Sequence, residues 1–118
     1  MKILVTGSRG KVGAATVSAL VEAGHAVTAC DLGAPVFERG LPGAPAYVRA
    51  DLTAAGDAFA VVRGHDAVIH AAAIPDPQHH PPHAVFANNL LATFNTLEAA
   101  MELAHRRLAQ REPVTRGV

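Results

Sequence analysis

The residues with the clearest chemical potential lie in TGSRGKVG, Thr6 to Gly13, where glycines recur every third residue. A glycine-rich turn between a buried strand and a helix directs backbone N–H groups at one point, and the helix dipole adds partial positive charge there. The natural occupant is a phosphate or pyrophosphate. Gly7 permits the sharp turn, Gly10 lets the backbone approach a ligand, and Gly13 lets the helix pack closely on the sheet.

A carboxylate further along the chain supports this interpretation. Asp31 follows an apolar run at about the 20-residue separation that places the ribose-binding acid of the dinucleotide fingerprint. Such a carboxylate accepts hydrogen bonds from the 2′-hydroxyl of the adenosine ribose and repels the 2′-phosphate of NADP, so we expect NAD rather than NADP. Arg9 could host that extra phosphate or be a solvated loop residue. The alternative is a structural turn with an unrelated surface aspartate.

A mononucleotide P-loop is the other candidate, because the pair Gly10-Lys11 occurs in the same stretch. It fails on spacing. Gly7 is too close to Gly10, and Val12 stands where a magnesium-binding serine or threonine is needed.

The elements that must position these residues alternate between strand and helix. Short apolar runs bounded by glycine or aspartate predict strands at 2–6, 26–30, 46–50 and 67–70. Helical spacing predicts three helices. The first starts near Gly10 or Lys11, buries Val12, Thr16, Val17, Leu20 and Val21, and stops at Gly24. The second is capped by Thr53, carries Leu52, Phe59 and Val62 inward, and stops at Gly64.

The third helix is expected over 84–107, with Pro82 in its first turn and Pro113 ending any continuation. Proline and glycine content predicts loops at 32–45 and 74–83. This order predicts a Rossmann-like three-layer α/β sandwich: a parallel sheet of order 3-2-1-4 with helices on both faces. We expect a cofactor-binding domain over 1–110 and a tail over 111–118.

Composition restricts the class of protein. Half of the 118 residues are apolar, and ten basic residues balance ten acidic ones, so we expect no nucleic-acid or membrane partner. The single cysteine, Cys30, cannot form an internal disulfide. Neither a signal peptide nor an apolar run of the roughly 20 residues that span a bilayer is recognisable. We expect a cytoplasmic protein.

Five motifs in order resemble the extended short-chain dehydrogenase/reductases, closest to the NAD-dependent epimerase/dehydratase members. They are TGSRGKVG, Asp31, ADL from Ala50, HAAA from His70, and NLLATFNTLEAA from Asn89, within residues 1–103. The resemblance implies an oxidoreductase that acts on a sugar-like or polyol substrate. The cofactor-binding residues are expected to be Gly7, Ser8, Arg9, Gly10, Lys11, Val12, Gly13, Asp31, Asp51, Leu52, Ala71, Ala72, Ala73 and Asn89.

The resemblance assigns particular roles to some of these residues. Asp51 would contact the adenine amino group, and Ala71 and Ala72 would lie near the pyrophosphate and nicotinamide ribose. Asn89 would support the active-site region. Each has a simpler interpretation: Asp51 could start the turn before a helix, Asn89 could be a solvated helix residue, and the alanines could only provide close packing.

The sequence departs from the family where its chemistry should be. The family needs a tyrosine four residues before a lysine. The tyrosine hydroxyl acts as acid or base, and the positive charge of the lysine lowers the pKa of that hydroxyl. This sequence has one tyrosine, Tyr47, and no lysine after Lys11, so we assign no catalytic residue. We expect a truncated Rossmann domain whose fourth strand and last helix are exposed and promote self-association. The alternative is a non-catalytic module that senses NAD or regulates a partner.

The histidines do not indicate a metal. His79, His80 and His83 lie in a proline-rich loop without a nearby cysteine, so we interpret them as solvated. His70 ends a strand beside the expected cofactor and could either contact a ligand or pack at the strand end.

Overall fold

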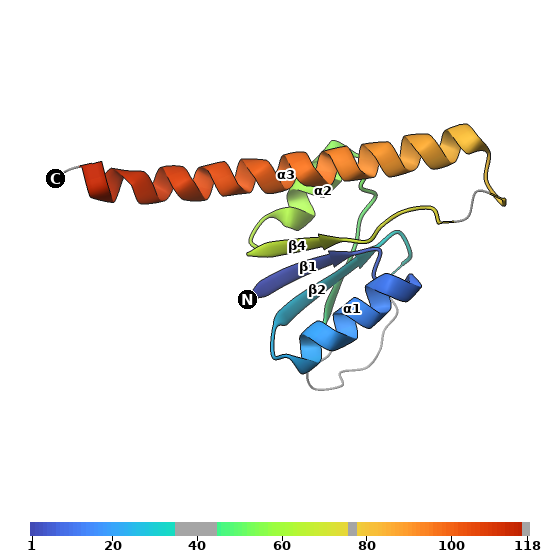
Figure 1. Cartoon of the computed structure of the whole chain (residues 1–118), viewed down its shortest axis with the longest axis horizontal. Helices are drawn as coiled ribbons and strands as arrows, with labels where there is room; N and C mark the ends of the chain where they lie inside the picture. The colour runs from blue at the N-terminus through green and yellow to red at the C-terminus, as the bar shows by residue number, and fades with distance from the viewer. Residues whose placement is uncertain (35–44, 76–77, 117–118) are drawn as a thin grey trace.

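The computed structural model describes residues 1–34, 45–75 and 78–116, with side chains up to residue 110. Four parallel strands form one sheet in the order β3-β2-β1-β4. The strands are β1 (Lys2–Thr6), β2 (Ala26–Asp31), β3 (Ala46–Arg49) and β4 (Ala67–His70). The helices are α1 (Lys11–Glu22), α2 (Ala55–Val62) and α3 (Pro82–Arg116). α1 covers one face of the sheet and α2 and α3 the other, which confirms the predicted fold (Figure 1).

β1 lies at the centre because its side chains are apolar on both faces of the sheet. Ile3 and Val5 pack with Val27 beneath α1. Leu4, which points to the opposite face, packs in the cluster formed with α2 and α3. Burial on both faces is what a central parallel strand requires. Among the described strands β4 pairs only with β1, so its other side is an edge of the sheet, as expected.

α1 begins and ends where the sequence predicts. After Ala23 the chain turns at Gly24, whose φ of 89° favours glycine. The Gly24 N–H donates to the Val21 oxygen and the His25 N–H to the Leu20 oxygen, which caps the helix. The expected burial of Val12 is wrong: it is 70% exposed, because the neighbouring Gly13 is the residue that faces the glycine loop.

α2 departs from the prediction at its start. Thr53 does not cap it, because the N-cap is Ala54 and the Thr53 hydroxyl donates to Asp51 Oδ1 at 2.6 Å. Phe59 is also misassigned. It is 38% exposed, since Ala58 and Val62 define the inner face of the helix and Phe59 projects to its side.

α3 is longer than predicted at both ends. It starts at Pro82, where proline suits a first turn, and it continues past the expected end at 107 and past Pro113 to Arg116. Proline removes a single backbone N–H, so here it weakens the last turn without ending the helix. The predicted loops at 32–45 and 74–83 are irregular as far as the helix start at Pro82, although 35–44 and 76–77 lie outside the described residues.

The ends of two strands differ by one residue from the prediction. β2 includes Asp31, and β3 ends at Arg49 rather than Ala50. Within the described part of the chain, no helix combines the length and apolar character needed to cross a bilayer.

Candidate functional site

A pocket opens where β1, β2 and β4 end, at the edge of the sheet where open α/β folds place their ligands. Its volume is about 170 Å³. That is below the roughly 300–1,000 Å³ of typical ligand clefts, so these residues form only part of a dinucleotide-sized site. The lining residues are Gly7, Gly10, Cys30, Asp31, Leu32, Ala50, Asp51, Leu52, Thr53, Ala71, Ala72, Ala73, Ile74, Pro75, Asn88 and Ala92.

Two glycines of the loop are needed by the protein itself. Gly7 has a φ of 65°, and a Cβ there would lie 2.6 Å from the Ala71–Ala72 peptide. A Cβ on Gly13 would overlap the Gly7 carbonyl oxygen. The close approach at Gly13 is therefore to the loop, not to the sheet as predicted. Gly10 differs, because its Cβ would meet only the Gly7 oxygen at 3.4 Å and the residue faces the pocket.

The N–H groups of the loop are already occupied. Ser8 donates to the Cys30 oxygen at 3.1 Å, Arg9 to Asp31 Oδ2 at 2.9 Å, and Gly10 to the Gly7 oxygen at 3.0 Å. The donors left for an anion are the amides of the first turn of α1, residues 11–13, because a helix gives its first amides no acceptor. That turn has no acidic residue and no side-chain cap. This end of α1 therefore fits a phosphate group.

The carboxylate of Asp31 is fixed at the tip of β2. Oδ2 accepts from the Arg9 N–H and Oδ1 from the Leu32 N–H at 2.7 Å, and the residue lines the pocket. The Arg9 side chain is also held, since Nη2 donates to the Ala34 oxygen and the guanidinium lies 4.4 Å from the ring centroid of Tyr47. The negative charge and the glycine loop therefore form one rigid unit.

The opposite wall of the pocket depends on Thr6. Its hydroxyl accepts from the N–H groups of Ala71 at 3.1 Å and Ala72 at 3.2 Å. The hydroxyl proton is then free to donate to His70 Nδ1 at 2.7 Å, which leaves the His70 Nε2 proton for Thr93 Oγ1 at 3.2 Å. Burial lowers the pKa of His70, which favours this neutral form. His70 therefore packs at the strand end and does not line the pocket.

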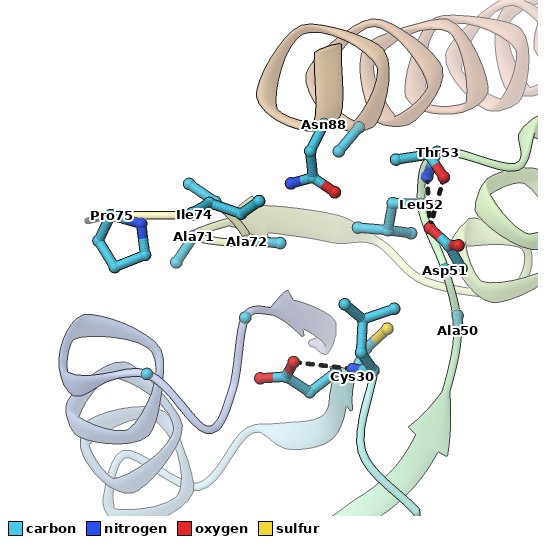
Figure 2. A pocket seen from close by; sticks show the side chains of 16 residues that line it. Cys30, Ala50, Asp51, Leu52, Thr53, Ala71, Ala72, Ile74, Pro75 and Asn88 are labelled. Carbon is cyan, nitrogen blue, oxygen red and sulfur yellow. Dashed lines mark hydrogen bonds between the residues drawn. The ribbon is translucent and has the colours of Figure 1, made fainter. Parts of the chain in front are cut away.

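The remaining wall comes from the chain after β3 and from α3. Asp51 Oδ1 accepts hydrogen bonds from both the N–H and the hydroxyl of Thr53 (Figure 2). This carboxylate oxygen therefore stabilises the turn before α2, while Asp51 still lines the pocket. Asn88 projects from α3 into the space between Ala72 and Leu52 (Figure 2). The predicted Asn89 exchanges two hydrogen bonds with Ile74 and holds the wall from behind.

Eight of the predicted site residues meet in the pocket: Gly7, Gly10, Asp31, Asp51, Leu52, Ala71, Ala72 and Ala73. Six do not line it: Ser8, Arg9, Lys11, Val12, Gly13 and Asn89. Ser8 Oγ is buried and, within the described part of the chain, has no hydrogen-bond partner. Asn88 was missed, and only its position beside Asn89 in the helix could have indicated it.

Cys30 lines the pocket but is unsuited to nucleophilic chemistry. Burial, followed by the charges of Asp31 and Asp57, raises the pKa of its thiol to about 11. The thiol therefore stays protonated near neutral pH. Among the described residues, no three histidine, cysteine or acidic side chains gather where they could hold a metal ion.

Several known proteins resemble this chain. Residues 3–111 match the model of the NAD dependent epimerase/dehydratase family. A UDP-galactose 4-epimerase structure is 34% identical, with a TM-score of 0.71, and the match covers 86% of this chain and 34% of that one. Uronate dehydrogenase from Agrobacterium tumefaciens is 27% identical, with a TM-score of 0.71 and coverage of 86% and 36%.

A third similar structure is UDP-glucose-4-epimerase from Stenotrophomonas maltophila with bound NAD and formylated UDP-arabinopyranose. It is 27% identical, with a TM-score of 0.69 and coverage of 86% and 33%. No curated protein sequence matches the chain. The chain spans about a third of the length of these solved structures. Because the family model covers nearly all of its residues, the chain belongs to the NAD-dependent epimerase/dehydratase family.

Proposed function

We propose that this chain is the NAD-binding part of an epimerase/dehydratase-type oxidoreductase and that it prefers NAD to NADP. The observation that carries the proposal is the position of Asp31, whose carboxylate lies in the same pocket as the glycine loop. A fixed negative charge there favours a ribose 2′-hydroxyl, which can donate to it, over a 2′-phosphate, which it repels.

The residues of this chain would hold the cofactor at three places. The first-turn amides of α1 would bind the pyrophosphate, with Gly10 leaving room for it. Asp31 would bind the adenosine ribose, and Asp51 with Leu52 would lie along the adenine. Ala71, Ala72 and Ala73, held by Thr6, would border the nicotinamide half. Bound NAD supplies a hydride acceptor, while this chain binds and orients it.

We propose a sugar-like or polyol substrate, because three similar structures are sugar-nucleotide epimerases or a uronate dehydrogenase. The sequence given has no tyrosine followed four residues later by a lysine. We therefore expect this chain alone to bind cofactor without turnover. The second candidate is a non-catalytic module that binds NAD in the cytoplasm.

The first experiment replaces Gly10 with tryptophan and titrates NAD by calorimetry. The backbone of Gly10 has a φ of −76°, which tryptophan adopts without strain, so the chain should fold while the indole fills the pocket. NAD affinity should fall at least about a hundredfold. Gly56→Trp is the control, because a Cβ on Gly56 meets nothing within 4 Å. Unchanged affinity in the folded Gly10→Trp variant would refute the site.

The second experiment tests cofactor choice with Asp31→Asn. The amide keeps an acceptor for the loop and loses the charge. We expect the preference for NAD over NADP to fall about tenfold or more. The same preference in both proteins would show that Asp31 does not select the cofactor.

We also propose that the chain self-associates through the exposed β4 edge and α3. Ile69 on β4 is 37% exposed, and α3 carries a row of exposed large apolar residues. Contiguous apolar surface of this kind marks an interaction site.

A further inference from the structure

Asn88 lines the pocket with an amide group that is only half used by the protein. It lies near the start of α3 and projects between Ala72 and Leu52 (Figure 2). Its Nδ2 donates to Asn89 Oδ1 at 3.2 Å, whereas within the described part of the chain no group donates to its Oδ1. A half-buried side chain with a spare acceptor on the wall of a pocket is a group that a ligand can meet.

The orientation of the Asn88 amide follows from its neighbour. The backbone N–H of Ile74 can only donate, and the atom that it meets at 2.7 Å is Asn89 Oδ1. The other end of the Asn89 amide donates to the Ile74 oxygen at 3.2 Å, which agrees with this assignment. Because Asn89 Oδ1 needs a donor opposite it, Asn88 must present Nδ2 to it and turn Oδ1 away. Figure 2 shows Asn88 with its nitrogen on the side of Ile74 and its oxygen on the side of Leu52.

The same end of the pocket holds a second spare acceptor. Asp51 Oδ1 is occupied by Thr53, but among the described residues nothing donates to Asp51 Oδ2. Thr53 directs both its N–H and its hydroxyl proton at Oδ1, so it offers a ligand no proton here. Asp51 and Asn88 therefore face the ligand with acceptors only. The matching group on a ligand is one that carries two protons, such as an amino group.

We propose that Asn88 binds the adenine of the dinucleotide and that its Oδ1 accepts a hydrogen bond from the exocyclic amino group, as a second acceptor beside Asp51. This inference rests on the proposed cofactor function and specifies how the base is selected. The amino group of adenine is a donor with two protons, one for each acceptor. The flat ring has apolar walls to lie against, which come from Leu32, Ala50, Leu52, Ala72 and Ala92.

The contact with Asn89 is what makes Asn88 selective. An isolated asparagine serves a carbonyl as well as an amino group, because its amide can turn over and offer either a donor or an acceptor. Turning the Asn88 amide over would set its oxygen against Asn89 Oδ1 with no proton between them, which loses one hydrogen bond and opposes two acceptors. Asn89 is therefore a positioning residue for base selection. Hypoxanthine, with a carbonyl oxygen in place of the amino group, would meet two acceptors.

Calorimetric titration with NAD and with nicotinamide hypoxanthine dinucleotide tests the contact. The wild-type chain should bind NAD at least about tenfold more tightly. Asn88→Leu removes the acceptor at nearly constant volume, and Asn88→Ala removes it without adding bulk. In both variants NAD affinity should fall about three- to tenfold while hypoxanthine dinucleotide affinity does not fall. Ala87→Leu is the control, because Ala87 is exposed on the same helix and does not line the pocket.

Two further variants separate the chemistry of Asn88 from its shape. Asn88→Asp keeps an acceptor at the same place and should retain the wild-type preference between the two dinucleotides. Asn89→Ala frees the Asn88 amide to turn over, so affinity for the hypoxanthine dinucleotide should rise about threefold. No rise in that variant would overturn the assigned orientation.

The ratio of the two affinities decides the proposal. An equal loss for both dinucleotides in Asn88→Leu and Asn88→Ala would show that the side chain only shapes the pocket, and so would overturn the contact with adenine. A ratio that stays at its wild-type value with no loss at all would do the same. Failure of the wild-type chain to bind NAD would instead refute the proposed function itself.

Discussion

α1 and α3 cover opposite faces of one sheet (Figure 1), yet they place their large side chains in opposite ways. α1 turns Val17, Leu20 and Val21 toward the sheet. α3 turns alanines, Asn95 and Thr96 inward, with Leu103 packed partly buried against the core, and leaves its other leucines, its phenylalanines and its methionine exposed. The difference shows that apolar content alone does not identify a core face. The large residues of α1 stabilise this domain, whereas those of α3 are available to something outside it.

The strictest requirement on the α1 side is the contact at Gly13. Gly13→Ala should lower the free energy of unfolding by about 2–3 kcal/mol, because its Cβ would overlap the Gly7 carbonyl. Gly56→Ala is the same change in α2 with open space around it, and it should raise that energy by up to about 1 kcal/mol. Urea denaturation measures both. Equal effects would mean that the loop can relax around a methyl group.

The two faces of α3 can be compared by exchanging the size of neighbouring side chains. Ala99→Leu overfills the buried face and should cost about 1–3 kcal/mol of unfolding free energy. Leu97→Ala on the exposed face should cost no more than about 0.5 kcal/mol while the chain is monomeric. Thermal unfolding of dilute samples measures both changes in unfolding free energy. A larger loss for Leu97→Ala than for Ala99→Leu would show that the exposed face of α3 already belongs to the core.

The smallest expected effect concerns the link from β1 through His70 to α3. Burial lowers the pKa of His70 in the folded chain, so below pH 6.5 the unfolded state takes up the proton more readily. The stability that this histidine contributes is present above its unfolded pKa and is lost as pH falls through the folded pKa. Wild type should therefore lose more stability between pH 7.5 and 5.5 than His70→Gln, and calorimetric melting at both pH values measures the difference. Identical losses would show that folding does not change the pKa of His70.

Much of the fold follows from short-range patterns. The β-branched run before Gly7 predicts β1, and Gly24 predicts the end of α1, because each depends on neighbours along the chain. Val12 and Phe59 were misassigned because helical spacing of apolar residues does not show which of them contact the core. Pro113 was misassigned because a proline can stand within a helix at a cost in stability, without ending it.

The site was predicted in outline and not in detail. The sequence indicated Gly10 and Asp31 because their spacing is that of a glycine turn, a helix and a second strand. It did not indicate Asn88, or that the loop amides are occupied by Cys30 and Asp31. Those facts depend on residues that meet only when the sheet is assembled.

Hydrophobic period and glycine spacing are local properties, so the sequence alone predicts the alternation of strands and helices, the parallel order of the sheet and the turn that suits a phosphate. Which amides stay free, which carboxylate oxygens are already bound and which face of α3 is left exposed depend on the assembled fold. Hydrogen bonds such as that from Arg9 to Asp31, and the burial of one helix face rather than another, are set by contacts between segments distant in the chain.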